Sequence, residues 1–215
     1  MSIYDIHTHH HPHEPGTAIV QLTPENFTPR PLHYYSVGLH PWHITNDWRI
    51  QMGKLYIMAL HQQVVMIGET GIDKKNSPAP LELQMEVFRE HVRLSQLVHK
   101  PLIIHCVKAI DELLALRKES KATLPWILHG FRGGIEQWQQ LSRAGILISI
   151  GQYYNTDLIN QIPLSALLLE SDDTHSISTV YERVSSEMGT DIGDIYYQVK
   201  SNIHNLLEQG YTIPF

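Results

Sequence analysis

Two histidines near the start of the chain are spaced so that they could bind one metal ion together. The sequence holds 15 histidines in 215 residues, and only Thr8 separates His7 from His9. Side chains alternate between the two faces of a β-strand, so both imidazoles point to the same side if this segment is extended. Ordinary polar strand ends also carry such pairs. A metal site therefore depends on what the rest of the chain supplies.

Further imidazoles and carboxylates each follow an apolar run elsewhere in the chain. With the first pair, the candidate metal ligands are His7, His9, Glu69, His105, His129 and Asp172, and His40 follows another such run. Groups of this kind are costly to remove from water without a partner, and divalent cations supply one. Because the set exceeds the four ligands of a tetrahedral zinc site, we expect two metal ions that share a bridging carboxylate.

The elements that would position these residues are short apolar runs bounded by turn residues, a pattern typical of a parallel sheet. Eight runs are expected to be strands: residues 3–8, 18–22, 34–39, 64–68, 102–106, 126–130, 146–150 and 166–170. Helical spacing is strongest over residues 81–98, with weaker patterns at 47–62, 110–119 and 135–143 and in the tail from Ser178, broken at Gly189 and closed by Gly210. This alternation predicts a (β/α)8 barrel, whose catalytic groups gather at the carboxyl ends of the strands.

Two connections are expected to lack a full helix, residues 24–31 and 155–163. No linker and no internal repeat interrupts the chain, so we expect residues 1–215 to form a single compact domain.

Composition restricts the classes of partner. The 16 Lys+Arg against 22 Asp+Glu give a net charge of −6, which argues against a broad basic surface that scans nucleic acid. It does not exclude an enzyme that holds phosphate through metal ions. No apolar run approaches the roughly 18–20 residues of a membrane span, and residues 1–13 lack a signal-peptide pattern. Cys106 is the single cysteine, so a reducing cytoplasm is the expected location.

The ordered motifs of the chain resemble the TatD family of metal-dependent hydrolases, known as deoxyribonucleases. The matching stretches are Asp5-Ile6-His7-Thr8-His9, Val37-Gly38-Leu39-His40-Pro41, Ile67-Gly68-Glu69-Thr70-Gly71-Ile72-Asp73, Pro101-Leu102-Ile103-Ile104-His105-Cys106, Leu128-His129-Gly130-Phe131 and Leu168-Leu169-Glu170-Ser171-Asp172. Six matches in order are far more specific than any one of them.

The resemblance implies a role for each candidate residue. His7, His9 and Asp172 would bind one metal, His105 and His129 the second, and Glu69 would bridge. His40 would be a catalytic histidine close to the scissile phosphate, and Asp172 could also act as a general base. The implied reaction is exonuclease-type hydrolysis of DNA or a small phosphodiester by a metal-activated water, with Mg²⁺, Mn²⁺ or Zn²⁺ as cofactor and no covalent intermediate.

The chain departs from the family pattern at two places. Where the family commonly has an arginine after the fifth-strand histidine, Cys106 is followed here by Val107 and Lys108. The long basic loop that usually follows the last ligand is replaced by Asp173-Thr174-His175. The remaining candidates to hold non-reacting phosphates are Lys74, Lys108 and Arg132. These losses affect the assignment of DNA as substrate more than the fold or the metal chemistry.

Other residues near the strand ends admit both a functional and a structural interpretation. Asp5 and Glu170 either orient an imidazole or fill a buried polar position, and Asp73 is expected to be structural. A solvated loop is expected for His10, His11 and His13 rather than further metal ligands. His43 and His175 are close enough to His40 and Asp172 in the chain to reach the mouth, but contact with substrate is the less favoured interpretation. A surface or packing role is expected for His61, His91, His99 and His204. Cys106 is expected to be a packed thiol rather than a nucleophile, and Trp42, Phe131 and Tyr153 either stack on a base or pack at the rim.

Two other functions compete with a phosphodiesterase. An amidohydrolase would open an amide, lactam or lactone on the same scaffold, but many of those enzymes bridge their metals with a carbamylated lysine where this chain has Glu69. The third possibility is a metal-holding protein without turnover, suggested by the missing arginine and the shortened loops. Oligomeric state is not constrained by the sequence.

Overall fold

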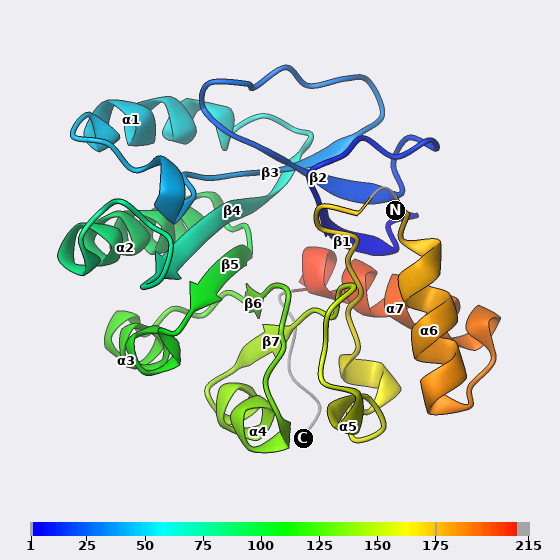
Figure 1. Ribbon diagram of the computed structural model, residues 1–215. Coiled ribbons are helices and arrows are strands. Elements are labelled where there is room, and N and C mark those ends of the chain that lie inside the picture. Colours follow the sequence, from blue (N-terminus) through cyan, green and yellow to red (C-terminus); the bar gives the residue numbers. More distant parts are fainter. Residues whose placement is uncertain (1, 175, 210–215) are drawn as a thin grey trace.

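The computed structural model of the protein describes residues 2–174 and 176–209 (Figure 1). Its described residues form seven parallel strands that neighbour one another in chain order. They are β1 (Asp5–Thr8), β2 (Ala18–Leu22), β3 (Tyr34–Val37), β4 (Val64–Asp73), β5 (Leu102–Val107), β6 (Trp126–Leu128) and β7 (Ile146–Ile148). Figure 1 shows the strands as a curled inner layer with the helices outside it.

The eighth position of the barrel is filled by an extended segment rather than by a regular strand. Isolated parallel bridges join Leu169 to Ile150 and Asp172 to Thr8. The amide of Ile150 donates to the carbonyl of Leu168 at 2.9 Å on one side, and the amide of Asp172 donates to the carbonyl of His7 at 3.0 Å on the other. The segment thus closes the ring between β7 and β1, and the predicted barrel is confirmed.

Helices alternate with the strands along most of the chain. They are the 3₁₀ helix η1 (Pro41–His43), α1 (Trp48–Met58), α2 (Leu81–Val98), α3 (Ile110–Ser120), α4 (Ile135–Arg143), α5 (Thr156–Ile159), the 3₁₀ helix η2 (Leu164–Ala166), α6 (Ser178–Met188) and α7 (Ile192–Gln209). The prediction for α2 is confirmed at both ends, and Gly189 ends α6 with a φ of 59°. Gly210 lies outside the described residues.

The two shortened connections differ from each other. Residues 24–31 contain no helix, as predicted. Residues 155–163 hold only α5, a helix of 4 residues, so the predicted lack of a full helix is confirmed there too. The 3₁₀ helix η2 includes Ala166, the residue expected to begin the eighth strand, so that strand boundary is wrong. Leu158 and Ile159 of α5 are buried, which explains why a single helical turn forms there: it covers the core beneath the shortened loop.

The largest error in the predicted strands concerns β4, which extends beyond residue 68 to Asp73. Gly68 and Gly71 allow β4 to lie close against β5. A Cβ at Gly71 would lie 2.0 Å from the carbonyl oxygen of His105, so only glycine fits. Glu69 therefore lies within a buried strand rather than after one.

The core consists of the strand interiors and the helix faces that pack on the outside of the barrel. On α2, Val87, Phe88 and Leu94 are at most 1% exposed. Phe88 packs against Trp126 of β6, with ring centroids 5.5 Å apart. Among the described residues, no helix is long and apolar enough to cross a bilayer.

Candidate metal centre

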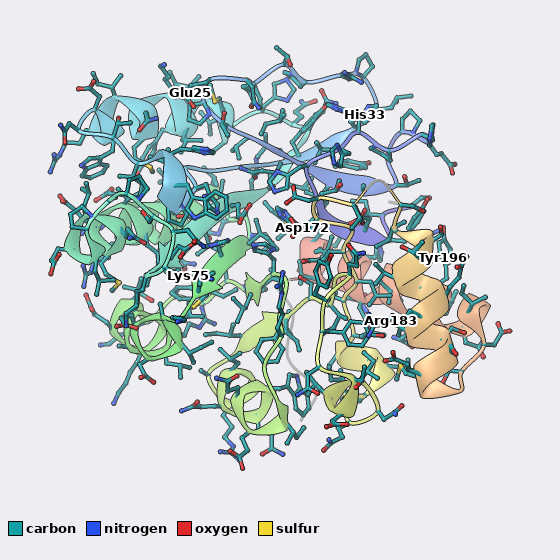
Figure 2. The ribbon with its side chains drawn as sticks, in the orientation of Figure 1. Glu25, His33, Lys75, Asp172, Arg183 and Tyr196 are labelled. Carbon is teal, nitrogen blue, oxygen red and sulfur yellow. The ribbon has the colours of Figure 1, made fainter. Side chains whose placement is uncertain are left out.

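All seven side chains predicted to carry chemistry come together at one end of the barrel. Figure 2 places Asp172 near the centre of the view, inside the ring of strands, with Glu25 and Tyr196 toward the outside. Three groups of predicted residues have donor atoms within 4.8 Å of one another, which are His7 with Glu69 and His129, His7 with His9 and Asp172, and His40 with Glu69 and His105. Residues up to 165 positions apart therefore share one small volume because parallel strands end at the same edge.

Glu69 lies at the centre of this cluster, and its two carboxylate oxygens face different histidines. Oε1 is 2.8 Å from His129 Nε2 and 3.0 Å from His105 Nδ1. Oε2 is 3.5 Å from the Nε2 atoms of both His7 and His9. Burial alone would raise the pKa of Glu69, but His129 and the other histidines lower it well below its usual value. The carboxylate is therefore ionised.

The histidines of β5 and β6 are oriented by carboxylates on their far sides. His105 Nε2 lies 3.2 Å from Asp73 Oδ2, and His129 Nδ1 lies 3.4 Å from Glu170 Oε1. When these nitrogens donate to the carboxylates, the opposite nitrogen of each ring presents its lone pair toward Glu69. Asp73 and Glu170 thus select the tautomers that a metal ligand needs.

His7, His9 and Asp172 form the other side of the centre. His9 Nε2 is 3.5 Å from Asp172 Oδ1, and His7 Nε2 is 3.7 Å from the same oxygen. Among the described residues, neither ring nitrogen of His7 has a hydrogen-bond partner, although the side chain is fully buried. An unpaired buried polar group costs about 1–3 kcal/mol. A divalent cation between these three residues would satisfy His7 Nε2, so the donor set fits such an ion.

His40 differs from the other histidines in how its nitrogens are used. Its Nδ1 accepts a hydrogen bond from the amide of Trp42 at 3.1 Å, and its Nε2 lies 3.2 Å from Glu69 Oε1. Burial lowers the pKa of His40, with Glu69 opposing the shift, so the ring is neutral at pH 7. Because Nδ1 is the acceptor, Nε2 carries the proton. His40 therefore presents a donor N–H to the site rather than a lone pair.

Comparison with known proteins identifies the family. The family described as TatD related DNase matches residues 19–208. The chain belongs to the TatD family of metal-dependent hydrolases. It is 29% identical over 147 residues to the uncharacterized metal-dependent hydrolase YabD of Bacillus subtilis, which covers 65% of this chain and 58% of YabD. It is also 29% identical over 147 residues to the 3′-5′ ssDNA/RNA exonuclease TatD of Citrobacter rodentium, covering 64% of this chain and 56% of that protein.

The fold is shared with solved TatD structures. The structure of YjjV, a TatD homolog from Escherichia coli, superposes with a TM-score of 0.79 at 21% identity, covering 93% of this chain and 87% of that one. The matched region spans less than two thirds of the length of the curated TatD relatives. Fold and family are therefore established.

Among the three candidate phosphate contacts in this TatD chain, the structure separates Arg132 from the two lysines. Lys74 Nζ is 2.5 Å from Glu112 Oε1 and is thus already paired. Lys108 is exposed, in a left-handed conformation just after β5. Arg132 lines a pocket that Asp172 also lines. Arg132 is thus the one of the three that shares a cavity with the centre.

The support given by two residues was not predicted from the sequence. Gln21 Oε1, buried on β2, accepts from the amide of Glu69 at 2.7 Å and from Ser36 Oγ at 2.9 Å, and so fixes the backbone that carries the central carboxylate. A glutamine in an otherwise apolar buried strand was the available signal. His91, predicted to be a surface or packing residue, is buried on α2, and its Nε2 accepts from the amide of Leu39 at 3.0 Å, next to His40.

The residues with two interpretations are also placed. Asp73 has the expected structural role, because its Oδ1 accepts from the amides of Lys75 and Asn76 at 2.8 Å and so caps the loop after β4. Its Oδ2 also contacts His105 and accepts from Trp42 Nε1 at 2.6 Å, which was not expected. Among the described residues, Asp5 makes its hydrogen bonds to other groups than imidazoles: it accepts from Ser171 Oγ at 2.6 Å and from the amides of Ser171 and His7. It thereby ties β1 to the segment that closes the barrel.

The aromatic and sulfur side chains near the strand ends divide into packed residues and exposed ones. Phe131 is 4% exposed and packs in the core, whereas Trp42 and Tyr153 are exposed at the rim. Cys106 is half-buried, and burial raises its pKa to about 12, so it is the packed thiol that was expected.

The remaining histidines lie outside the centre. His10 Nε2 contacts the carbonyl of Asp173 at 3.1 Å, and His11 lies beside His33 with ring centroids 5.1 Å apart, so both are half-buried rather than solvated. His13 and His43 are exposed. His175 lies outside the described residues.

Proposed function

We propose that the protein is a two-metal phosphodiesterase that removes nucleotides from the end of a nucleic acid strand. The observation that carries the proposal is the position of Glu69, whose Oε1 faces His105 and His129 while its Oε2 faces His7 and His9. A carboxylate that turns one oxygen toward each of two sets of donors is suited to bridge two cations.

The donor atoms divide between the two cations. His7, His9 and Asp172 would hold one, His105 and His129 the other, and Glu69 both. Bound cations of this kind acidify water and neutralise charge on phosphoryl oxygens. Imidazole-rich donor sets favour Zn²⁺ or Mn²⁺, and the carboxylates also accept Mg²⁺.

Asp172 and His40 would handle protons and charge during hydrolysis. The Asp172 side chain is 31% exposed, so it can reach an incoming water and accept its proton. His40 directs its Nε2 proton into the site and can donate it to a phosphate oxygen as negative charge grows there. A neutral donor suits this task because it stays protonated at pH 7.

The substrate class follows from charge and relatives together. The Citrobacter relative is named as an exonuclease of single-stranded DNA and RNA. With a net charge of −6, this chain would bind a strand end at the mouth of the barrel rather than track a long duplex. A cytoplasmic location is consistent with the single reduced cysteine.

The test combines metal analysis with rates on three substrates. Purified protein loaded with Mn²⁺ should bind two equivalents and hydrolyse bis(p-nitrophenyl) phosphate and a single-stranded oligonucleotide, with slower turnover of a monoester and none of an amide panel. Asp172→Asn should lose about 10²- to 10⁴-fold in rate, the range for a general base. Asp157→Asn, on α5 at the surface, is the matched control.

Three outcomes would contradict the proposal. Full activity in Asp172→Asn would show that the chemistry is elsewhere. Turnover of amides without phosphoesters would favour an amidohydrolase, and two tightly bound metals without turnover of any ester would favour a binding protein.

A further inference from the structure

A small pocket opens beside the metal centre on the side of Asp172. Its volume is about 110 Å³, and it is lined by Gly130, Arg132, Gly151, Gln152, Tyr153, Glu170, Asp172, Asp173 and Thr174. Most of these residues come from the loops after β6 and β7 and from the segment that closes the barrel. Anything bound there would therefore lie next to the bond that the centre cleaves.

Arg132 and Tyr153 meet at this pocket from two different loops. Arg132 Cζ lies 5.1 Å from the centroid of the Tyr153 ring, within the range of a cation–π contact. The Tyr153 side chain is 61% exposed. Among the described residues, no carboxylate lies within ion-pair distance of Arg132, in contrast to Lys74. The guanidinium is thus held by a ring and still has its hydrogen-bond donors to offer.

The carboxylates of the pocket are mostly engaged elsewhere. Glu170 accepts from Ser149 Oγ and faces His129, while Asp172 faces His7 and His9. Arg132 is the one cation among the described residues that line the pocket. A Cβ at Gly151 would lie 3.2 Å from Glu170 Oε1, so glycine keeps this wall open. The pocket therefore combines a guanidinium that can donate hydrogen bonds to an anion with the exposed face of an aromatic ring.

We propose that Arg132 and Tyr153 form the subsite for the nucleotide next to the scissile bond, Arg132 binding a flanking phosphate and Tyr153 stacking on the base. The proposal rests on the proposed phosphodiesterase function. Arginine matches phosphate oxygens with a rigid fork of donors, and every base has a face that stacks on an aromatic ring. At about 110 Å³ the pocket is smaller than the roughly 300–1,000 Å³ that encloses a small-molecule ligand, so the bound group must extend out of it, as a strand does.

The base contact is tested with chromogenic diesters that differ in the nucleoside. Methyl p-nitrophenyl phosphate has no base, whereas the p-nitrophenyl esters of thymidine 3′- and 5′-phosphate carry one on either side of the cleaved bond. The wild-type enzyme should prefer at least one thymidine ester. Tyr153→Leu should reduce that preference by roughly 5- to 100-fold, mainly through KM, while Tyr153→Phe retains it because the ring remains.

The phosphate contact is tested with an oligonucleotide at several salt concentrations. Arg132→Gln should raise KM for a single-stranded oligonucleotide and reduce the slope of log affinity against log salt by about 0.7, the value for one phosphate contact on a single strand. The loss should be much smaller on methyl p-nitrophenyl phosphate, which has no flanking phosphate. Tyr197→Leu on α7 and Arg143→Gln in the last turn of α4 are the matched exposed controls.

Thermal melting identifies any variant that fails to fold, and the other member of the pair Tyr153→Leu and Arg132→Gln then carries the test. An unchanged base preference in Tyr153→Leu together with an unchanged salt slope in Arg132→Gln would overturn the subsite. Wild-type protein that cleaves none of the diesters would instead overturn the proposed function, so the two failures are distinguishable.

Discussion

The two sides of the candidate metal centre are built in different ways. On the β5 and β6 side, His105 and His129 have side chains 13% and 9% exposed, and each is backed by a buried carboxylate. On the β1 side, the side chains of His9 and Asp172 are 36% and 31% exposed, and neither ring nitrogen of His7 has a hydrogen-bond partner among the described residues. One side is closed and oriented by the protein, whereas the other is open and completed only by a ligand.

This difference assigns separate tasks to the two sides. Asp73 and Glu170 hold the imidazoles of the closed side in place before any ion binds, which reduces the cost of ordering them. The open side faces the pocket with Arg132 and gives water and substrate access to Asp172. We therefore expect the closed side to retain its geometry without metal and the open side to depend on the ion.

Removing the Glu69 carboxylate, which both sides share, should abolish the difference between them. This change has the largest expected effect. Glu69→Gln removes the charge that faces both sides, so metal content should fall at both positions and kcat/KM on a diester by about 10³-fold or more, beyond the roughly 10–100-fold typical of outer-shell changes. Elemental analysis and steady-state kinetics give the measurement. Glu86→Gln, whose carboxylate pairs with Arg49 on the surface, is the control. Retention of both metals in Glu69→Gln would contradict the bridging role.

Removing an orienting carboxylate should affect the closed side alone. Asp73→Asn retains a carbonyl oxygen for the Trp42 indole but no longer favours the Nε2–H tautomer of His105. Metal affinity at one position should fall by about 10–100-fold while the other position stays filled at limiting metal. Titration with Mn²⁺ measures both. Asp111→Asn, exposed in the first turn of α3, should bind as the wild type does. Equal weakening of both positions would show that the sides are not independent.

Metal removal should lower the thermal stability because the ion satisfies His7. At a metal concentration 100 times Kd, binding stabilises the folded state by about 2.7 kcal/mol, which corresponds to roughly 5–10 °C in Tm for a chain of this size. Calorimetric scans with and without a chelator measure the shift. Glu69→Gln should show little response to the chelator. An identical Tm for the loaded and the chelated wild type would mean that the open side needs no ion.

The smallest expected effect concerns His91, which supports the backbone beside His40. Burial lowers the pKa of His91 to about 4, against 6.5 for an unperturbed histidine. As pH falls below 6.5, the unfolded chain takes up a proton that the folded chain excludes, so the free energy of unfolding decreases. Between pH 7 and pH 5 this loss amounts to about 2 kcal/mol. Urea denaturation at several pH values measures this loss, and the free energy of unfolding should depend less steeply on pH in His91→Gln than in the wild type. An equal pH dependence in both proteins would refute the role of His91.

Much of the barrel was predictable from local pattern. The apolar runs and the amphipathic spacing of α2 depend on neighbours two to four residues apart, so they are legible in the sequence. The order of the strands followed because parallel units are added in chain order. The extension of β4 past Gly68 was missed because glycine usually ends a strand, and only the approach of the β5 backbone explains why it does not here.

The candidate site was predictable in its members and not in its arrangement. Residue type and position after an apolar run singled out His7, Glu69 and Asp172, since few other groups belong at the mouth of a barrel. The support given by Gln21 and His91 depends on contacts across 48 and 52 positions, which no local pattern encodes.

The sequence by itself determined which donors this protein has and that strand ends would bring them to one edge, because side-chain alternation and parallel pairing are local rules. Only the tertiary structure decided which oxygen of Glu69 faces which histidine, which nitrogen of His105 points inward, and which side of the centre stays open. Those outcomes depend on distances of a few ångströms between elements far apart in the chain, and hydrogen-bond strength changes steeply over that range.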